Sequence, residues 1–467
     1  MASCHLLLIH LIEKSYMSKL SRYNHFQPWE DGSHLAYNAV SGAVAVLNQA
    51  TYNTYLELSK KLSANGCTEL IAEEQQLLQQ LRYGKFAYPD GFSELDGLKF
   101  DHFRIRFDQS ALLVVIAPTL ACNMACEYCY EANKHGRMSH AVVRDVIAYI
   151  RKRSQGIERM EVQWYGGEPL LALDIIEEIS HGILGQETNS TFKYESMVIT
   201  NGYLLDSTTV DRLIDLKISA VQVTLDGPLR IHDSKRPLKN GRSSYQTILE
   251  NIKYASSRMS VGVRVNIDKH FKPEWISELV SELQAAGVHN KIWMHFGQIE
   301  ASESSCSNIS EACYSSKDYS RAETEYYKLL LNEGFHIQKL PSPVGAFCMA
   351  QQTSGVLIDP DGDFYSCFKV VGDKSRTIGN VASDINYQSP EFQRLFRFDP
   401  FETEECRECS ILPICMGGCP ARRCNQSIDS ESLCDSWKYN LEPMLEIIAL
   451  ARQRQMEQAV PMNQEKS

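Results

Sequence analysis

The chain has 467 residues, which allows two to four domains and a core large enough to fold without a disulfide scaffold. Lys and Arg number 47 and Asp and Glu 58, so the formal charge of −11 argues against a nucleic-acid binder, whose footprint would be basic. Hydrophobic residues make up 43% and charged residues 22%, which is ordinary for a soluble protein and unlike a fibrous or disordered one.

The fifteen cysteines do not suggest a secreted disulfide protein, which would usually be short and carry a signal peptide. The apolar run at 6–12 lacks a preceding basic region and a small-residue cleavage site, and it is too short to span a bilayer. Met17 is an alternative start. The sequence therefore predicts a cytoplasmic protein without a membrane partner, in a reducing compartment where clustered cysteines more often bind metal.

The first hundred residues predict a hairpin followed by helices. Apolar alternation, a turn at Ser41-Gly42 and helical spacing place these elements at 35–37, 43–47, 48–62 and 73–81. A turn at Pro89-Asp90-Gly91 then leads into a stretch to Asp108 that we expect to be a linker. Residues 1–108 are thus predicted to form a small N-terminal α+β domain with its linker.

From Leu112 onward, apolar runs alternate with helical stretches, which is the pattern of βα units around a parallel sheet. We expect strands at 112–116, 159–164, 195–200, 220–225, 261–267 and 291–295. Six such strands predict an α/β fold, a partial (β/α)6 TIM-like barrel over 109–340. Chemistry in such a barrel gathers at the C-terminal ends of the strands.

Past Pro341 the sequence changes to short strands, turns and dense cysteine. A small, loop-rich, metal-stapled domain over 341–440 would have this composition. A helix is expected over Trp437–Arg454, and residues 441–467 are assigned to a C-terminal helix and tail.

The first cysteine cluster directly follows the first strand of the predicted barrel. Cys122, Cys126 and Cys129 have the spacing C-x3-C-x2-C, and three thiolates can bind three irons of a 4Fe-4S cluster, leaving one iron open to a substrate or cofactor. A zinc knuckle is the alternative, with His135 as a nearby fourth ligand.

These residues resemble the radical SAM superfamily, whose motif has this spacing with an aromatic residue, here Tyr128, before the last cysteine. Gly166-Gly167-Glu168-Pro169, after the second strand, resembles the GGEP segment of that family. The resemblance implies that this segment binds the amino group of S-adenosylmethionine. Glycines let a backbone approach a ligand closely, and a carboxylate can hold an ammonium.

Further matches fall at the ends of later strands. Thr200-Asn201-Gly202 and Asp226-Gly227 resemble the TNG and LDG segments of the family, which implies that they line the cofactor pocket. By the same resemblance, Arg264 and Asn266 contact the carboxylate and ribose of the cofactor; inward polar residues on a strand would be costly without a ligand.

The stretch His232-Asp233 with Arg236 and Gly241 resembles peptide-modifying members of the family, and a solvated loop is the alternative. The family chemistry implied is reductive cleavage of S-adenosylmethionine to methionine and a 5′-deoxyadenosyl radical, which removes a hydrogen atom from an unactivated carbon. The protein then binds, orients and excludes water.

The second cluster resembles the SPASM signature of seven cysteines, which in the family hold two auxiliary 4Fe-4S clusters, making three clusters in all. The resemblance assigns Cys348, Cys367 and Cys419 to the auxiliary cluster nearer the barrel. It assigns four to the distal one: Cys406, Cys409, Cys415 and Cys434. A zinc ribbon is the alternative.

Some relatives complete the nearer cluster with a further cysteine, and here Ser342 stands at that position. The nearer cluster is therefore expected to have an open iron for a substrate thiolate, unless Cys306, Cys313 or Cys424 provides the fourth ligand. Cys424 is expected to be a spare buried thiol.

The resemblance implies an iron-sulfur oxidoreductase that matures peptides or proteins, with an external electron donor such as flavodoxin or ferredoxin. Sulfatase maturases carry an Asp base where this chain has Phe368, and residues 23–62 loosely resemble the leader-binding region of ribosomal-peptide maturases. We therefore expect a precursor peptide as substrate, its leader adding as a strand to the N-terminal hairpin. The expected product is an intramolecular cross-link, either a thioether or a carbon-carbon or carbon-oxygen bond.

Two other functions stay open at this level. An anaerobic sulfatase-type maturase would oxidise Ser or Cys to formylglycine. An iron-sulfur redox-sensing regulator would bind a partner through its N-terminal domain. Such a sensor would not need the cofactor pocket around Glu168, Asn201, Arg264 and Asn266.

Overall fold

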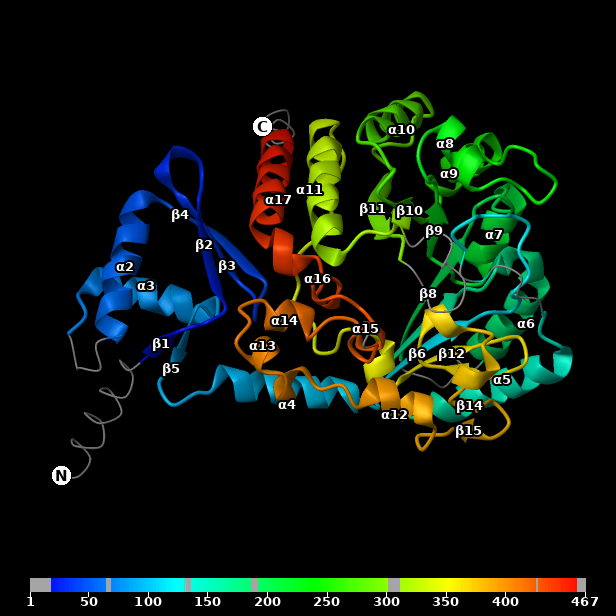
Figure 1. Ribbon diagram of the computed structural model, residues 1–467, viewed down its shortest axis with the longest axis horizontal. Helices are drawn as coiled ribbons and strands as arrows, with labels where there is room; N and C mark the ends of the chain where they lie inside the picture. The colour runs from blue at the N-terminus through cyan, green and yellow to red at the C-terminus, as the bar shows by residue number, and fades with distance from the viewer. Residues whose placement is uncertain are drawn as a thin grey trace.

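Eight strands form the central sheet of the computed structural model, in the order β11-β10-β9-β8-β7-β6-β12-β13 (Figure 1). The structure describes residues 18–63, 69–129, 131, 136–185, 192–300, 311–425 and 427–459. The run at 6–12, Met17, His135, Cys4, Cys67 and Cys306 lie outside them. The strands are β6 (Ala111–Ile116), β7 (Arg159–Trp164), β8 (Lys193–Thr200), β9 (Ala220–Thr224), β10 (Ser260–Ile267), β11 (Ile292–Gln298), β12 (Gly355–Ile358) and β13 (Phe364–Tyr365).

The predicted α/β fold and its six strands are confirmed, each within three residues of the expected bounds. Strands β6 to β11 are parallel, and β12 joins β6 in parallel with Gly355 opposite Leu113. Such strands are covered on both faces, and Val114 and Val162 are fully buried. Together they make the partial TIM-like barrel.

Helices cover the outer face of this sheet (Figure 1). Their apolar residues recur at helical spacing, as in Val143, Val146 and Ile150, which are fully buried in the main core. The helices are α5 (His140–Arg153), α6 (Leu173–Leu184), α7 (Ser207–Asp215), α8 (Leu229–Lys235), α9 (Tyr245–Ala255), α10 (Glu274–Ala285) and α11 (Ser316–Asn332). The carboxyl ends of the strands remain free for the site.

The N-terminal region contains a three-stranded antiparallel sheet rather than a simple hairpin. Its extra strand escaped prediction because Asn24-His25-Phe26-Gln27-Pro28 has no apolar alternation. Its elements are β1 (Ser18–Leu20), β2 (Asn24–Pro28), β3 (His34–Asn38), β4 (Ala43–Leu47), α2 (Gln49–Ser63), α3 (Ala72–Tyr83) and β5 (Ala87–Pro89). The region has its own small core, in which Leu58 and Leu77 are buried.

The expected linker before Asp108 is wrong, because this stretch contains helix α4 (Glu94–Arg106). The helix begins at Ser93, whose side chain accepts a hydrogen bond from the Asp96 amide at 3.3 Å. Two buried residues attach it to the C-terminal part of the chain. His102 Nδ1 bonds to the Gly345 carbonyl at 2.6 Å, and Arg106 Nε donates to the Gln351 carbonyl at 3.2 Å.

The C-terminal part consists of short helices followed by a long one. They are α12 (Pro390–Phe396), α13 (Glu404–Arg407), α14 (Leu412–Cys415), α15 (Pro420–Arg423), α16 (Ser430–Leu433) and α17 (Trp437–Ala459), with the short strands β14 (Gly379–Asn380) and β15 (Asp384–Ile385). Single-turn 3-10 helices are η1 (Glu30–Gly32), η2 (Pro169–Ala172), η4 (Met349–Gln351), η5 (Phe368–Val370), η6 (Lys374–Arg376) and η7 (Pro400–Glu402).

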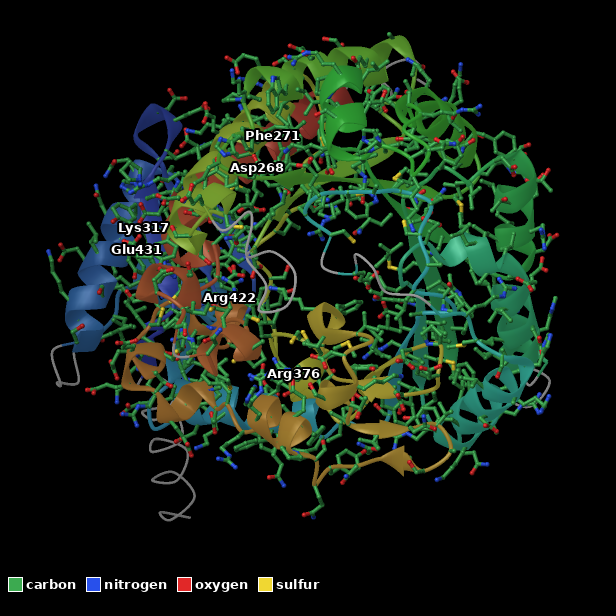
Figure 2. All side chains as sticks on the ribbon, turned by 45° about the vertical axis from the view of Figure 1, so that its right-hand side comes forward. Asp268, Phe271, Lys317, Arg376, Arg422 and Glu431 are labelled. Atoms are coloured by element: carbon green, nitrogen blue, oxygen red, sulfur yellow. The ribbon has the colours of Figure 1, made fainter. Side chains whose placement is uncertain are left out.

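This part packs against the barrel through α11. Figure 2 shows Lys317 of α11 beside Glu431 of α16, and their ion pair measures 2.6 Å. Arg422 binds the same two elements, donating to Ser316 Oγ at 2.6 Å and to the Ser432 carbonyl at 2.7 Å. The division of the chain at 108, 340 and 440 stays a prediction, and β12 and β13 extend the main sheet across the second boundary.

No helix within the described ranges has both the length and the apolar character needed to cross a bilayer.

Candidate functional site

The carboxyl ends of the barrel strands surround a cavity of about 460 Å³, a size suited to a small molecule. Seven of the ten predicted cofactor-binding residues line it: Tyr128, Gly166, Gly167, Thr200, Asn201, Arg264 and Asn266. Glu168, Pro169 and Asp226 are buried behind this lining. The place predicted for chemistry in a parallel barrel thus coincides with a cavity.

The first cysteine cluster lies in the loop after β6, beside this cavity. Cys129 lines the cavity, and its amide donates to the Cys126 carbonyl at 3.3 Å, which closes a tight turn between the two thiols. Burial raises the pKa of all three thiols, that of Cys129 to about 12, and the negative charges of Cys126 and Cys122 add to this rise. Buried thiols next to one another and to the carboxylates of Glu131 and Asp226 need a cation to ionise together.

The arrangement of these thiols bears on which metal group they fit. A single zinc ion holds its sulfur ligands at about 2.3 Å, so four ligands must converge on one point. Among the described residues, no three His, Cys, Asp or Glu side chains converge in this way. A 4Fe-4S cluster instead takes one thiolate at each iron, which suits thiols that are neighbours without sharing a centre. The three thiols therefore suit such a cluster, and the zinc-knuckle alternative stays open because His135 lies outside the described residues.

Gly166 and Gly167 let strand β7 approach the cysteine loop. A Cβ on Gly166 would lie 2.3 Å from the Thr119 carbonyl oxygen, and one on Gly167 would lie 2.4 Å from that of Leu120. Gly166 also has φ of +117°, which side chains rarely adopt. The two glycines thus allow close packing against the segment that carries Cys122, in addition to lining the cavity.

Glu168 is fully buried, and its carboxylate accepts three hydrogen bonds within the protein. Thr200 Oγ1 donates at 2.7 Å, the Asn201 amide at 2.8 Å and the Leu170 amide at 3.0 Å. Burial raises its pKa, although these bonds act in the opposite direction. Glu168 therefore ties the ends of β7 and β8 together, and its contact with a cofactor ammonium stays a prediction. Pro169 begins the buried turn η2.

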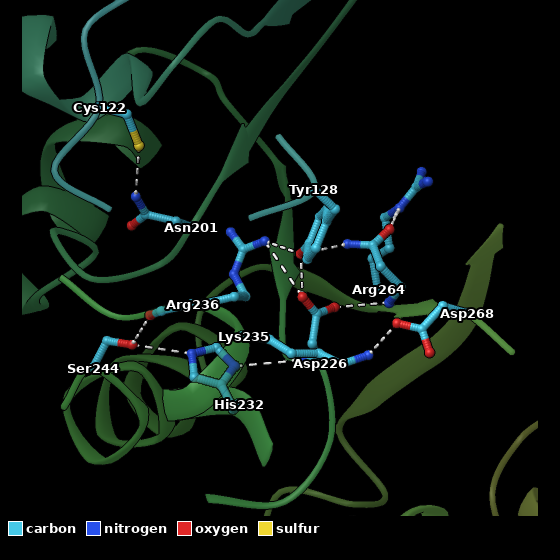
Figure 3. A network of polar contacts seen from close by, with 11 residues as sticks. Cys122, Tyr128, Asn201, Asp226, His232, Lys235, Arg236, Ser244, Arg264 and Asp268 are labelled. Carbon is cyan, nitrogen blue, oxygen red and sulfur yellow. Dashed lines mark hydrogen bonds and ion pairs between the residues drawn. The ribbon is translucent and has the colours of Figure 1, made fainter. Parts of the chain in front are cut away.

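Asn201 links this strand end to the cysteine loop. Its Nδ2 donates to Asn123 Oδ1 at 2.7 Å. The same nitrogen contacts the Cys122 sulfur at 3.8 Å (Figure 3). An amide that donates to a thiolate stabilises its charge. Asn201 therefore fits a position beside a metal-bound Cys122.

Tyr128 is the centre of a buried polar network (Figure 3). Its hydroxyl donates to Asp226, accepts from Arg236 at 2.5 Å and accepts from Asn266 Nδ2 at 3.2 Å. The Asp226 carboxylate also accepts from the Asn266 amide at 2.8 Å and pairs with Arg236 at 3.5 Å. Burial raises the pKa of Tyr128 well above its usual value, so the phenol stays neutral.

Arg236 comes from the stretch that resembles peptide-modifying proteins, and the solvated-loop alternative for this stretch is wrong. His232 is fully buried, with Nδ1 3.3 Å from the Asp226 amide and Nε2 3.0 Å from Ser244 Oγ. Burial opposes the charge of Arg236, yet Tyr128, Cys126 and Asp226 raise its pKa well above the ordinary value. Arg236 therefore contacts Tyr128 from a buried part of this stretch.

Arg264 extends the network along β10. Its Nε donates to Asn266 Oδ1 at 2.8 Å, so the amide of Asn266 is oriented with Nδ2 toward Tyr128. Both side chains line the cavity, as expected for inward residues of this strand.

Several lining residues were missed by sequence reasoning. Gln298 is the last residue of β11 and Glu300 follows that strand, and Phe368 and Lys369 follow Cys367. Lys369 Nζ donates to Glu300 at 2.5 Å, and Lys369 and Arg422 lower the pKa of Glu300 although burial acts the other way. Gln298 and Glu300 stand at a strand end and could have been found, whereas Phe368 and Lys369 come from a segment expected in another domain.

The three predicted nearer auxiliary thiols, Cys348, Cys367 and Cys419, lie close enough to Lys369 to share electrostatic effects with it. Burial raises the pKa of Cys348 to about 12, and the charges of Cys419 and Cys367 add to this. Cys424 donates to the Arg394 carbonyl at 3.2 Å, in keeping with a spare thiol. Ser342 is exposed.

The four predicted distal thiols form a second group. Burial raises the pKa of Cys415 to about 12, and the charges of Asp435, Cys434 and Cys409 contribute; Cys406 likewise senses Cys434 and Cys409. These groupings match the sets that the SPASM resemblance implies. Among the described residues, no group of three His, Cys, Asp or Glu side chains is arranged to hold a single metal ion, and the zinc-ribbon alternative stays open.

A match to a protein-family model identifies the domain that the barrel forms. Residues 116–283 match the model of the radical SAM superfamily, which includes Cys122, Cys126, Cys129 and the strand ends around the cavity. The chain contains a radical SAM domain. This domain implies a 4Fe-4S cluster and S-adenosylmethionine as cofactors.

Two curated proteins are similar to this chain in sequence. The cysteine-type anaerobic sulfatase-maturating enzyme of Clostridium perfringens is 23% identical over 367 residues, which are 70% of this chain and 94% of that enzyme. An uncharacterised protein of Methanocaldococcus jannaschii is 29% identical over 177 residues, 38% of this chain, and the match spans only 59% of that protein.

Solved structures share the fold. The structure of anSMEcpe with bound AdoMet and Cp18Cys peptide has a TM-score of 0.55 and 20% identity, covering 75% of this chain and 99% of that one. SuiB of Streptococcus suis has a TM-score of 0.52 and 15% identity, covering 88% of this chain and 99% of that one; its complex with the precursor peptide SuiA has a TM-score of 0.50. The chain thus shares its fold with these structures and contains a radical SAM domain.

Proposed function

We propose that the protein introduces an intramolecular cross-link into a ribosomally made precursor peptide. The observation that carries this proposal is that one cavity is lined by Cys129 of the first cysteine cluster and by Phe368 and Lys369, which directly follow Cys367 of the second. A peptide residue bound there would lie between the predicted radical source and the predicted electron acceptor. The proposal includes three 4Fe-4S clusters and an external donor such as flavodoxin or ferredoxin.

When bound, the first cluster and S-adenosylmethionine supply a 5′-deoxyadenosyl radical, the chemistry of this family. Cys122, Cys126 and Cys129 would hold the cluster, while Asn201 contacts the Cys122 sulfur and orients the loop. Arg264 and Asn266 would bind the cofactor from the cavity wall, with Tyr128 fixed by Asp226 and Arg236 behind them. The enclosing strand ends exclude water from the reacting atoms.

A peptide substrate is supported by the extent of the fold likeness. SuiB, a protein with a precursor-peptide complex, covers 88% of this chain, against 75% for the anSMEcpe structure. In the N-terminal sheet β4 pairs only with β3 among the described residues, and Val46 is 58% exposed. Strand β2 instead faces the C-terminal part of the chain, where Gln27 Nε2 donates to the Glu442 carbonyl at 3.1 Å and His25 Nε2 lies 3.2 Å from the Ser410 carbonyl. A leader peptide would therefore add to β4.

Phe368 favours cross-linking over formylglycine formation. The Asp that serves as base in sulfatase maturases is replaced by an aromatic ring, which packs edge-on against Tyr165 at 5.0 Å. A thioether is slightly favoured among the cross-links, because three rather than four cysteines are assigned to the nearer cluster and Ser342 is exposed. A sulfatase-type maturase is the second candidate, supported by the 94% coverage of the Clostridium enzyme.

The test is co-expression with any small peptide found encoded beside the gene, followed by tandem mass spectrometry. A cross-link predicts the loss of two hydrogens with fragmentation blocked between the two joined residues. Formylglycine would instead be trapped by a hydrazine reagent and would leave fragmentation intact. No mass change would indicate epimerisation or no reaction, and either result would contradict the cross-link.

A further inference from the structure

Two cations contact the four thiols predicted to hold the distal auxiliary cluster. Arg423 Nη2 lies 3.6 Å from the Cys434 sulfur and 3.9 Å from the Cys406 sulfur, and Lys438 Nζ lies 3.4 Å from the Cys409 sulfur. Three of the four sulfurs therefore accept a charge-assisted contact. The fourth, Cys415, accepts a hydrogen bond from the Asp435 backbone, while the charge of the Asp435 carboxylate acts against its ionisation.

Arg423 is held in place by the loop that carries these ligands. Its Nε donates to the Gly417 carbonyl at 2.8 Å, its amide donates to the Cys419 carbonyl at 3.0 Å, and its guanidinium lies 5.9 Å from the Phe398 ring. A planar guanidinium fixed at one end can present its other nitrogen to two acceptors at once. Its contact with both thiols is thus built into the loop.

The loop can approach Cys434 only because it contains glycine. Gly418 has φ of +79°, and a Cβ on it would lie 2.7 Å from the Leu433 carbonyl oxygen. Gly417, with φ of +83°, would place a Cβ 2.7 Å from the Phe398 ring. This close approach brings Cys415 and Arg423 beside the segment that ends in Cys434.

The two cations differ in exposure. Arg423 is half-buried, whereas Lys438 is exposed at the start of α17. Water and salt screen an exposed charge much more than a buried one. The field of Arg423 at the thiols is therefore the larger and the less dependent on salt.

We propose that Arg423, with Lys438 in a lesser role, raises the reduction potential of the distal auxiliary cluster. A cluster gains negative charge when it accepts an electron, and cations and hydrogen bonds at its sulfur ligands stabilise the reduced form. Glu405 near Cys406 and Asp435 near Cys415 act in the opposite direction. The distal cluster then becomes the onward acceptor of the electron that bond formation delivers to the nearer cluster. This inference rests on the three-cluster assignment of the proposed function.

The test is an EPR-monitored redox titration of the anaerobically reconstituted full chain. The distal signal is defined as the one that a Cys434→Ala variant loses. Arg423→Gln should move its midpoint to more negative potential by at least a tenfold change in the reduction equilibrium, which is 59 mV for one electron. Lys438→Gln should give a smaller shift that shrinks at high salt, and Arg423→Lys an intermediate one, because one ammonium cannot span both thiols.

Arg321→Gln is the matched control, since Arg321 forms an exposed ion pair with Asp318 on α11. It should leave every midpoint unchanged. An unaltered distal midpoint in Arg423→Gln with full iron content would overturn the inference. If that variant loses iron, unaltered midpoints in Arg423→Lys and Lys438→Gln would overturn it equally. If the Cys434→Ala variant keeps every EPR signal of the wild-type chain, the three-cluster assignment is overturned as well.

Discussion

Replacing Gly167 with Ala tests whether the approach of β7 to the cysteine loop sets the geometry of the site. The added Cβ would lie 2.4 Å from the Leu120 carbonyl oxygen and 2.5 Å from that of Ala121, whereas ordinary contact begins at 3.4 Å. Both neighbours are backbone atoms, so the strand and the loop must separate by about 1 Å. A shift of this size at reacting groups can cost about 100-fold in rate.

The assay is the initial rate of 5′-deoxyadenosine formation by the reconstituted protein, with iron content and thermal unfolding measured on the same sample. Gly167→Ala should fold, with a destabilisation of about 1–3 kcal/mol, and should cleave S-adenosylmethionine about 100-fold more slowly. Gly185→Ala is the matched control, because its Cβ meets only the His181 carbonyl oxygen at 3.1 Å. Equal rates in both variants would refute the claim that this contact positions the cysteine loop.

Three further predictions concern the buried network and the clusters. Burial and Arg236 lower the pKa of His232 from 6.5 to about 4, so the unfolded chain binds a proton at a pH where the folded chain does not. The free energy of unfolding should therefore fall as the pH drops from 6.5 to 4, by up to about 3 kcal/mol more than in His232→Gln; parallel pH curves for the two proteins would contradict this. Arg236→Met leaves Asp226 buried without its cation, and chemical denaturation should show a loss of about 3–5 kcal/mol. Arg230→Met, which breaks an exposed pair with Glu278, should cost less than about 1 kcal/mol. Similar losses in Arg236→Met and Arg230→Met would contradict the claim that Asp226 and Arg236 form a buried pair. Replacing Cys122, Cys126 and Cys129 together by Ala should remove a third of the bound iron and leave the auxiliary EPR signals intact; loss of all iron would contradict independent clusters.

Much of the barrel could be predicted because short stretches of the sequence determine its strands. Each strand is an apolar or alternating run of five to eight residues, and residues placed at the strand ends, such as Thr200 and Asn201, do line the cavity. Helix α4 was missed because its apolar residues do not follow one face: Leu98 is buried, whereas Phe100 is 67% exposed. Its stability comes from contacts with Gly345 and Gln351, which lie more than 200 residues away.

The site could be predicted as a set of residues but not as a set of contacts. The sequence around Glu168 does not show that its carboxylate accepts hydrogen bonds from Thr200 and Asn201 and therefore lies behind the cavity lining. Nor does the sequence show that Arg236 would reach Tyr128, 108 residues earlier in the chain. Such contacts depend on how the loops pack over the strand ends, which spacing does not encode.

The central claim is that this chain cleaves S-adenosylmethionine by radical chemistry at the first cysteine cluster. The most direct measurement is 5′-deoxyadenosine formation by the chain reconstituted anaerobically with iron and sulfide, with dithionite as reductant. The account predicts reductant-dependent 5′-deoxyadenosine from the wild-type chain and none when Cys122, Cys126 and Cys129 are replaced by Ala. A wild-type chain with its full iron content and no cleavage would contradict it.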